Sequence, residues 1–262
     1  MPADRSLWQG QAALLPLSCL MAQQLESQVQ VRPGRNPDPV REAACLLVLV
    51  ALALLAFWPV LQNGFVNWDD PAYITRNPLL HLPLPELLRS AWSTFPLGNY
   101  HPLTTVGQAL LHAVFGPSPL AFHLVSLLTH LCNLLLVYAL LRRFGCSVYA
   151  AGGATLLFAV HPLRVEAVAW ASAQKDLWCT GFVLVALHAY LSYVRSDERR
   201  SKRYYGLCLV AFALALLSKG TAMVLPLLLC LVDLALGREV PGRRRWLDKL
   251  PFFALAALFG VI

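Results

Sequence analysis

The stretch ACLLVLVALALLAFWPVLQ, residues 44–62, decides the fold, because it carries no charged side chain. A helix of about 20 apolar residues crosses the hydrocarbon core of a bilayer, so this stretch predicts a transmembrane helix. The whole chain of 262 residues has a matching composition: 58% of its residues are hydrophobic and only 13% are charged. An average soluble domain has about 25% charged residues. The sequence therefore predicts a membrane protein with several spans.

Further apolar stretches follow the first at short intervals. The stretches expected to cross the membrane are 119–141, 147–160, 177–194, 204–218 and 221–236. Residues 251–262 begin a seventh span but are too few to cross alone. We therefore expect an all-α fold: a polytopic bundle of six transmembrane helices and the start of a seventh, in a chain truncated at its C-terminus.

Residues 1–43 are more polar than the rest and end in VRPGRNPDPVRE, residues 31–42. The prolines and the glycine of that stretch oppose a continuous helix. We expect a disordered cytoplasmic tail here, followed by one transmembrane domain over residues 44–262.

The basic residues account for the net charge of +7 and predict the topology. They gather in the tail and in three connectors between apolar stretches: 142–143, 195–203 and 238–249. Lys and Arg are enriched in the cytoplasmic loops of membrane proteins, so the tail and these connectors are expected on the cytoplasmic side, and no nucleic-acid partner is implied. Three segments then fall on the outer side: about 63–118, 161–176 and 219–220.

The first outer segment contains VNWDDPAYITRNP, residues 66–78, with two adjacent carboxylates, Asp69 and Asp70. One interpretation is structural, because Asp70 followed by Pro71 fits the N-cap and first position of a helix. The other is catalytic, because adjacent carboxylates favour proton uptake nearer neutral pH, as a general base requires. Both interpretations stay open at this point.

The same segment contains a second predicted helix, LTTVGQALLHAVFG, residues 103–116. Thr104, Gln108 and His112 recur every four residues and therefore share one face. The stretch is too short and too polar to cross the bilayer. We expect an amphipathic helix that lies along the membrane surface.

The second outer segment, HPLRVEAVAWASAQKD (161–176), is expected to form one amphipathic helix. Arg164 and Lys175 fall near one face of that helix, and Glu166 falls on another. Together with Lys219 in the tight turn, they are among the few cations on the outer side. Arg binds phosphate through paired hydrogen bonds and Lys binds it as a point charge, so these cations fit a phosphate-bearing ligand.

Simpler interpretations stay open for both features. The predicted helix is also consistent with a solvated face held by ion pairs, such as Asp176 with Lys175 or a neighbour. Lys219 lies beside Gly220 at the end of a span, where a lysine side chain commonly extends towards water.

Within the expected span 119–141, one polar stripe is formed by His123, Ser126, His130 and Asn133. Lipid does not tolerate such a stripe, so we expect it to face the protein interior. Hydrogen bonds between helices are the simpler interpretation, and the lining of a transport path is the other.

Five stretches occur in this order along the chain: NGFVNWDDPAYITRNPLL, NYHPLTTV, FHLVSLLTHLCNLLLVYALLRRFG, LLFAVHPLRVEAVAWASAQKD and LLSKGTAMVLPLLLCLVDLAL. Together they resemble the membrane portion of the transmembrane and tetratricopeptide-repeat protein family, and especially its bacterial relatives. The resemblance covers about residues 55–236. In NYHPL a histidine stands where the animal members have an arginine, which favours the bacterial branch.

This family is similar to the GT-C superfamily of polytopic glycosyltransferases, and its animal members are O-mannosyltransferases that use a lipid-phosphate-linked mannose. The resemblance implies an inverting transferase that moves a sugar from polyprenyl phosphate to a hydroxyl of a protein or another acceptor on the outer face, with no cofactor and no metal ion. It implies that the acidic pair, Asp69 and Asp70, is catalytic, with one of the two as the base. The residues it implies for binding the donor are His101, His161, Arg164, Glu166, Lys175, Asp176 and Lys219.

The expected setting is that of an integral multi-pass membrane protein, in the bacterial inner membrane if it belongs to the bacterial branch. Its expected partners are membrane lipids, a lipid-linked sugar donor and an acceptor. The chain carries no repeat of about 34 residues, the period of tetratricopeptide repeats. Two other functions stay open: a transporter of lipids or sugars whose path is lined by the polar stripe, and a non-catalytic anchor for a downstream repeat domain.

Overall fold

The computed structural model describes residues 38–238 and 247–261. Within these ranges every regular element is a helix and no strand is formed, which confirms the prediction of an all-α fold. The predicted tail, residues 1–43, lies outside the described residues except for the start of the first helix.

The described helices follow the predicted apolar stretches and add several short ones. In chain order they are α2 (Pro39–Phe57), η1 (Trp58–Gln62), η2 (Pro71–Thr75), η3 (Pro78–His81), α3 (Leu84–Ser93), η4 (Pro96–Gly98), α4 (Pro102–Phe115), α5 (Pro119–Arg143), α6 (Val148–Val160), α7 (Leu163–Ala169), η5 (Ala171–Ala173), α8 (Gln174–Arg195), α9 (Glu198–Ser218), η6 (Gly220–Val224), α10 (Leu225–Ala235) and α12 (Leu250–Val261). The η elements are 3₁₀ turns, except η2, which is a π-helix.

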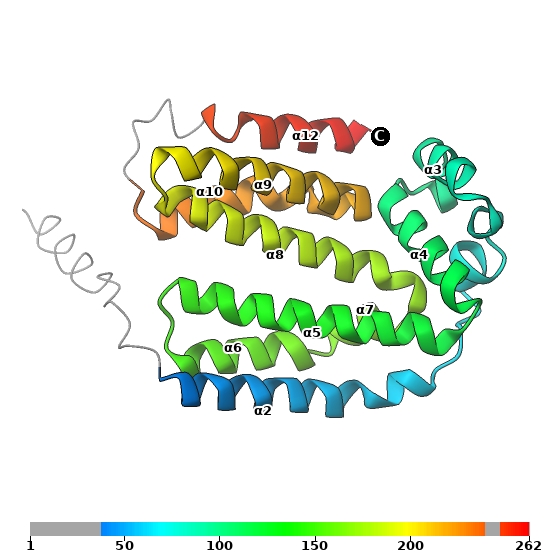
Figure 1. Ribbon diagram of the computed structural model, residues 1–262, viewed down its shortest axis with the longest axis horizontal. Coiled ribbons are helices and arrows are strands. Elements are labelled where there is room, and N and C mark those ends of the chain that lie inside the picture. The colour runs from blue at the N-terminus through cyan, green and yellow to red at the C-terminus, as the bar shows by residue number, and fades with distance from the viewer. Residues whose placement is uncertain (1–37, 239–246, 262) are drawn as a thin grey trace, which may run out of the picture. The chain divides into compact units, whose positions relative to one another are not determined.

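The long helices run side by side, and the segments predicted for the outer side meet at one end of them. Figure 1 shows α2, α5, α8, α9 and α12 in this arrangement, with α3 and α4 at one end. At that end the Thr104 hydroxyl donates a hydrogen bond to the Ser218 carbonyl at 3.0 Å. The Gln174 amide donates to the Phe122 carbonyl at 2.9 Å. The N-terminal ends of α5 and α8 and the C-terminal end of α9 therefore lie together.

Length and composition make three of the described helical stretches candidate membrane spans: Pro39–Gln62, Pro119–Arg143 and Ala171–Arg195. A fourth is possible if α6 and α7, which are bent by 63° at the break between them, count as one span. Residues Gly220–Ala235 and Leu250–Val261 form shorter apolar helices. The described residues thus establish three or four candidate spans, and the arrangement with six stays a prediction.

At the other end of the bundle, charged side chains connect the helices to one another. The Arg142 guanidinium lies 2.5 Å from the Glu42 carboxylate and connects α5 to α2. The buried Lys249 ammonium lies 2.6 Å from the buried Asp233 carboxylate and 2.9 Å from Asp248. A buried charge is tolerated only with such partners. These contacts hold α10 against the start of α12.

The polar stripe of α5 is buried, as the sequence predicts: His123, Ser126, His130 and Asn133. The His130 ring is hydrogen-bonded to the Ala159 carbonyl of α6 at 3.0 Å. The Asn133 amide donates to the Leu177 carbonyl of α8 at 2.8 Å. The interpretation as hydrogen bonds between helices is therefore confirmed for these two side chains, and they connect α5 to both of its neighbours.

The polar face of α4 packs against the protein. Thr104 and Gln108 are buried, and the hydroxyl of Thr104 reaches the end of α9 through Ser218. The exposed positions of α4 are apolar instead, and include Leu110 and Val114. The spacing predicted one polar face correctly, and tertiary contacts cover that face. The position of α4 along a membrane surface stays a prediction.

The prediction of one amphipathic helix over residues 161–176 is wrong. Helix α7 ends at Ala169, Trp170 is extended at φ −106° and ψ 119°, and α8 begins at Gln174. In a continuous helix the N–H of Ser172 would bond to the carbonyl four residues earlier. It bonds instead to the side chain of Asp70 at 2.9 Å. A long-range hydrogen bond therefore replaces the local one at the break.

Helix α4 approaches α8 closely at Gly107, where an added Cβ would lie 2.4 Å from the Trp178 ring. We expect Gly107→Ala to lower the melting temperature of the full-length protein in detergent, measured by circular dichroism. Gly206→Ala is the matched control, since a Cβ on that α9 residue meets nothing within 4 Å. Both substitutions raise helix propensity by the same amount. The difference in stability between the two variants therefore measures the cost of the overlap with the Trp178 ring, about 1–3 kcal/mol. Equal melting temperatures would contradict the close approach.

Candidate functional site

The candidate site is a cavity of about 160 Å³ at the end of the bundle where the predicted outer segments meet. Its lining residues are Gly98, Asn99, Tyr100, His101, Lys175, Lys219, Gly220 and Phe259. They come from the segment before α4, the first turn of α8, the turn between α9 and η6, and α12. Two ammonium groups and one imidazole thus share a small cavity, which fits an anionic ligand.

His101 is buried and lines this cavity just before α4 begins. Its ring centroid lies 5.1 Å from that of Tyr73. Burial lowers the pKa of His101 to about 4, and the positive charge of Lys175 adds to the effect. The ring is therefore neutral at pH 7. Its Nε2 atom is buried and has no hydrogen-bond partner among the described residues.

Tyr73 of η2 connects the two sides of the cavity. The Lys175 ammonium lies 4.4 Å from the centroid of the Tyr73 ring, a cation–π contact. The Asn99 amide donates to the Tyr73 hydroxyl at 3.2 Å. Burial raises the pKa of the Tyr73 phenol, and the Asp69 charge adds to that shift, although the hydrogen bond from Asn99 opposes it. Tyr73 therefore stays protonated at neutral pH and positions Lys175.

Lys219 is held by an ion pair with Asp176. Its ammonium lies 2.5 Å from the Asp176 carboxylate, and about a third of each side chain is exposed. The simpler interpretations expect Asp176 to pair with Lys175 or a neighbour, and the Lys219 side chain to extend towards water. The structure pairs Asp176 with Lys219 instead, which places the Lys219 side chain along the wall of the cavity.

The two adjacent carboxylates have different surroundings. Asp70 is fully buried. One of its oxygens accepts from the Val66 N–H at 2.7 Å, and the other accepts from the Ser172 N–H at 2.9 Å. Asp70 does stand at the N-cap position of η2 with Pro71 after it, as the structural interpretation expects, but its side chain makes no capping hydrogen bond. Asp70 instead joins the first outer segment to the second.

Asp69 is half-buried, and its carboxylate accepts no hydrogen bond from any residue that the structure describes. Its negative charge acts on both Tyr73 and Lys175. Asp69 is therefore close enough to Tyr73 and to Lys175, a cavity-lining residue, for its charge to act on both. Of the two predicted catalytic residues, only Asp69 has a carboxylate that accepts no hydrogen bond within the described part of the chain.

The remaining predicted residues lie around the site. Glu166 is exposed, and its charge acts on Lys175. His161 accepts from the Leu163 N–H at 3.2 Å and so caps the start of α7. The Arg164 guanidinium lies 4.5 Å from the Phe158 ring centroid. None of these three lines the cavity, because the break before α8 separates α7 from Lys175.

Among the larger side chains of the site, sequence reasoning missed Tyr73, Asn99, Tyr100 and Phe259. A signal existed for Tyr73, since it follows Asp69 by one helical turn in DDPAY. Asn99 and Tyr100 directly precede His101 in NYHPL. Phe259 reaches the site only through the packing of α12, which no local pattern predicts.

The contacts of Asp70 predict a structural role. Asp70→Ala removes the partners of two backbone N–H groups, a buried one on Ser172 and a partly buried one on Val66, and an unsatisfied buried group costs about 1–3 kcal/mol. We expect the free energy of unfolding to fall by about 2–4 kcal/mol, measured as a lower melting temperature. Asp69→Ala is the matched control and should change stability by less than about 0.5 kcal/mol. Equal losses of stability in both variants would contradict the role of Asp70 in joining the two outer segments.

The lowered pKa of His101 predicts a pH dependence of stability. The usual pKa of histidine is 6.5, and that of His101 is about 4. Between these pH values the histidine is protonated in the unfolded chain but not in the folded protein, so stability falls as the pH falls through this range. We expect His101→Gln to lose less stability than the wild type between pH 7 and pH 4.5, by about 2–3 kcal/mol. Parallel melting curves of the two proteins against pH would contradict a buried neutral His101.

Comparisons with known proteins show the family of the chain. Residues 101–262 match the dolichyl-phosphate-mannose-protein mannosyltransferase family. The protein O-mannosyl-transferase Tmtc1 of Drosophila melanogaster is 34% identical over 209 residues, which cover 76% of this chain and 24% of that protein. The protein O-mannosyl-transferase F38B6.6 of Caenorhabditis elegans is 30% identical over 202 residues, 72% of this chain and 28% of that protein.

A human relative, protein O-mannosyl-transferase TMTC3, is 30% identical over 162 residues, 58% of this chain and 17% of that protein. The chain thus spans between 17% and 28% of the length of these relatives. No solved structure matches. The predicted family resemblance is confirmed, and the bacterial branch stays a prediction. With its apolar helices, the chain is an integral membrane protein that belongs to the dolichyl-phosphate-mannose-protein mannosyltransferase family.

Proposed function

We propose that the protein transfers a sugar, mannose by its family, from a polyprenyl-phosphate donor to a hydroxyl of a protein or glycan acceptor, with inversion at the anomeric carbon. The observation that carries the proposal is the convergence of His101, Lys175 and Lys219 on one cavity beside the unbonded carboxylate of Asp69. A phosphate needs cations and hydrogen-bond donors, and the acceptor hydroxyl needs a base.

Asp69 is the proposed general base. The acceptor oxygen attacks the anomeric carbon on the face opposite the phosphate, and its proton passes to Asp69. The bond between the anomeric carbon and the phosphate oxygen breaks, and its electron pair leaves with the phosphate. The proposed role of Asp70 is to hold the loop that carries Asp69, because both Asp70 oxygens accept backbone hydrogen bonds.

Lys175 and Lys219 are the proposed partners of the leaving phosphate. Preorganised positive charge stabilises negative charge that develops in a transition state. Tyr73 and Asp176 hold the two ammonium groups in place before the donor arrives. His101, neutral at pH 7, supplies a ring nitrogen for a hydrogen bond to the donor. In the proposed mechanism, no step uses a metal ion or a cofactor.

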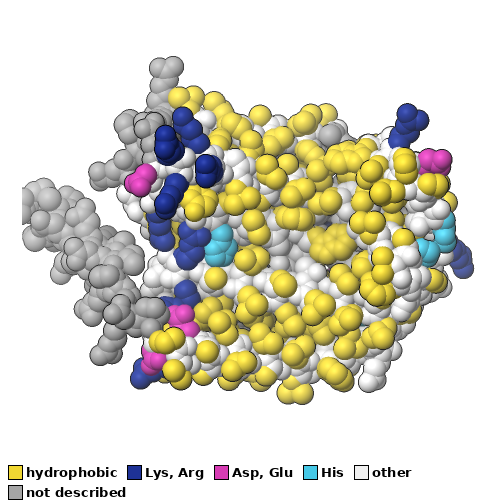
Figure 2. All heavy atoms as spheres, in the orientation of Figure 1, with side chains coloured by type: hydrophobic (Ala, Val, Ile, Leu, Met, Phe, Trp, Pro, Cys, Tyr) yellow, Lys and Arg dark blue, Asp and Glu magenta, His cyan; other side chains and the backbone are white. Residues whose placement is uncertain are grey.

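We also propose that the cavity faces the outer side of the membrane, with six spans in the bundle and a cytoplasmic N-terminus. Figure 2 supports this orientation, because Lys and Arg side chains gather at the end of the bundle away from α3 and α4. Cytoplasmic surfaces of membrane proteins are enriched in these residues. If the protein belongs to the bacterial branch, the membrane is the bacterial inner membrane.

A transporter remains the second candidate and has less support. Its predicted path was the polar stripe of α5, and His130 and Asn133 of that stripe bond to the carbonyls of α6 and α8. An anchor without catalysis would require neither the cation cavity nor the carboxylate of Asp69. The transferase is therefore the function that the site supports best.

The transfer of radiolabelled mannose from polyprenyl-phosphate mannose to protein, in membranes that contain the full-length protein, tests the proposal. We expect Asp69→Asn to lower kcat by about 10²–10⁴-fold, since it removes a general base. Lys219→Met should raise KM for the donor. Glu86→Gln is the matched control, because Glu86 is an exposed carboxylate on α3 in the same outer segment. Unchanged transfer by correctly inserted Asp69→Asn would exclude Asp69 as the base.

A further inference from the structure

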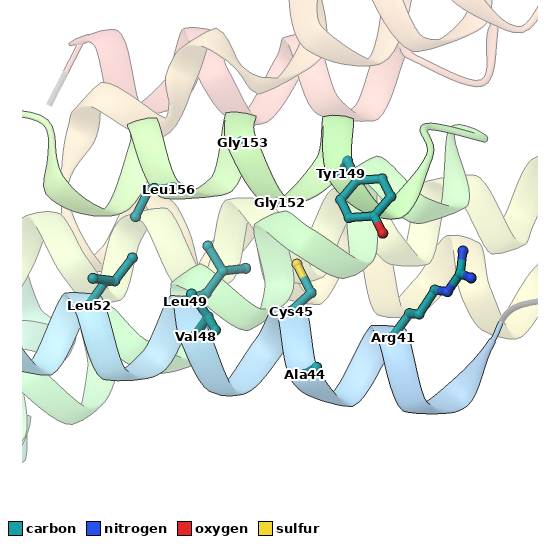
Figure 3. A pocket seen from close by; sticks show the side chains of 10 residues that line it. All are labelled: Arg41, Ala44, Cys45, Val48, Leu49, Leu52, Tyr149, Gly152, Gly153 and Leu156. Atoms are coloured by element: carbon teal, nitrogen blue, oxygen red, sulfur yellow. The ribbon is translucent and has the colours of Figure 1, made fainter.

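A second cavity, about 360 Å³ in volume, lies between α2 and α6 and opens along the protein surface. Figure 3 shows Arg41 and Tyr149 at one end of this groove and Leu52 and Leu156 at the other. Pockets that hold small ligands measure roughly 300–1,000 Å³. The groove thus has a polar end, an apolar body and sufficient volume for part of an amphiphile.

Two neighbouring glycines of α6 form the groove. A Cβ on Gly152 would lie 2.7 Å from the Cys45 sulfur, so Gly152 allows α6 to approach α2 closely. A Cβ on Gly153 would meet nothing within 4 Å, so this position keeps the groove open. The space is therefore a property of the helix surfaces and does not depend on how one flexible side chain is placed.

The groove continues the surface that the first span presents to lipid. Only 22% of the most apolar window of Pro39–Gln62 is buried. Leu47 is 71% exposed and Val48, which lines the groove, is 57% exposed. An apolar surface of this kind on a membrane protein is covered by acyl chains. The apolar body of the groove is thus reached directly from the hydrocarbon core.

The polar end of the groove fits an anionic headgroup. Arg41 pairs with Asp38 at 2.9 Å, but both side chains are largely exposed, and such a surface pair is weak. The Asp38 carboxylate also caps α2 and contacts the Nε of Arg41, so a phosphate can accept hydrogen bonds from the Nη groups of the same guanidinium. The nearby Glu42 is already paired with Arg142 at 2.5 Å. The Tyr149 hydroxyl, at the same end, is a further donor.

We infer that the groove between α2 and α6 binds one acyl chain of an anionic phospholipid, whose phosphate contacts Arg41 and Tyr149. The site lies at the end of the bundle opposite the cavity of His101. It therefore differs from the proposed donor site in place and in chemistry. Anionic lipids are concentrated in the cytoplasmic leaflet, which agrees with the predicted side of this end.

Photolabelling in nanodiscs tests this site. The full-length protein is placed in phosphatidylcholine nanodiscs with a trace of phosphatidylglycerol that carries a diazirine on one acyl chain, and labelled peptides are identified by mass spectrometry. We expect labels within residues 41–52 and 148–156. Gly153→Leu should lower this labelling about tenfold by filling the groove. Gly206→Leu, at an equally open position on α9, is the matched control and should leave it unchanged.

Two further variants test the headgroup contact and provide a second way to fill the groove. Arg41→Gln should reduce the preference for the phosphatidylglycerol probe over a phosphatidylcholine probe about fivefold. If Gly153→Leu fails to insert, Val48→Trp fills the groove from α2 and should give the same loss. The inference would be overturned if labelling persisted in both filled variants or fell equally in Gly206→Leu. Stronger labelling by a polyprenyl-phosphate probe would also overturn it.

Discussion

The buried carboxylate of Asp70 is the contact on which the candidate site depends. Its oxygens accept hydrogen bonds from the backbone N–H groups of Val66 and Ser172. Burying a polar group costs free energy unless the group is hydrogen-bonded. The N–H of Ser172 is available to Asp70 because α7 ends at Ala169 and no helical carbonyl occupies it. This hydrogen bond therefore joins the break before α8 to the first outer segment.

This break decides which cations reach the cavity. Lys175 lies in the first turn of α8, where its ammonium contacts the Tyr73 ring. Arg164 remains on α7 and stacks over a phenylalanine of α6. A single helix over residues 161–176 would have placed these two side chains near one face. Lys219 approaches from a different helix end and is held there by Asp176, so the positive charge of the site comes from separate segments.

The two ends of the bundle combine the same residue types in different ways. At the end with α3 and α4, charges border a cavity and remain accessible. At the opposite end, Lys249 and Asp233 are buried together, and Arg142 connects α5 to α2 through Glu42. Ion pairs at that end hold helices together. The apolar groove between α2 and α6 lies beside these pairs, with Arg41 at its edge.

The sequence by itself determined the all-α class, the membrane setting and the positions of the long helices, because a helix satisfies its backbone hydrogen bonds locally. It also singled out Asp69, Lys175 and Lys219. It could not separate Asp69 from Asp70, since one of the two donors to Asp70, the N–H of Ser172, lies 102 residues away in the chain. Tyr73 had a local signal, its place one turn after Asp69, but its contacts with Lys175 and Asn99 join segments that are distant in sequence. Only the tertiary structure decided these roles, because the partners of a buried polar group come from segments that are distant in sequence.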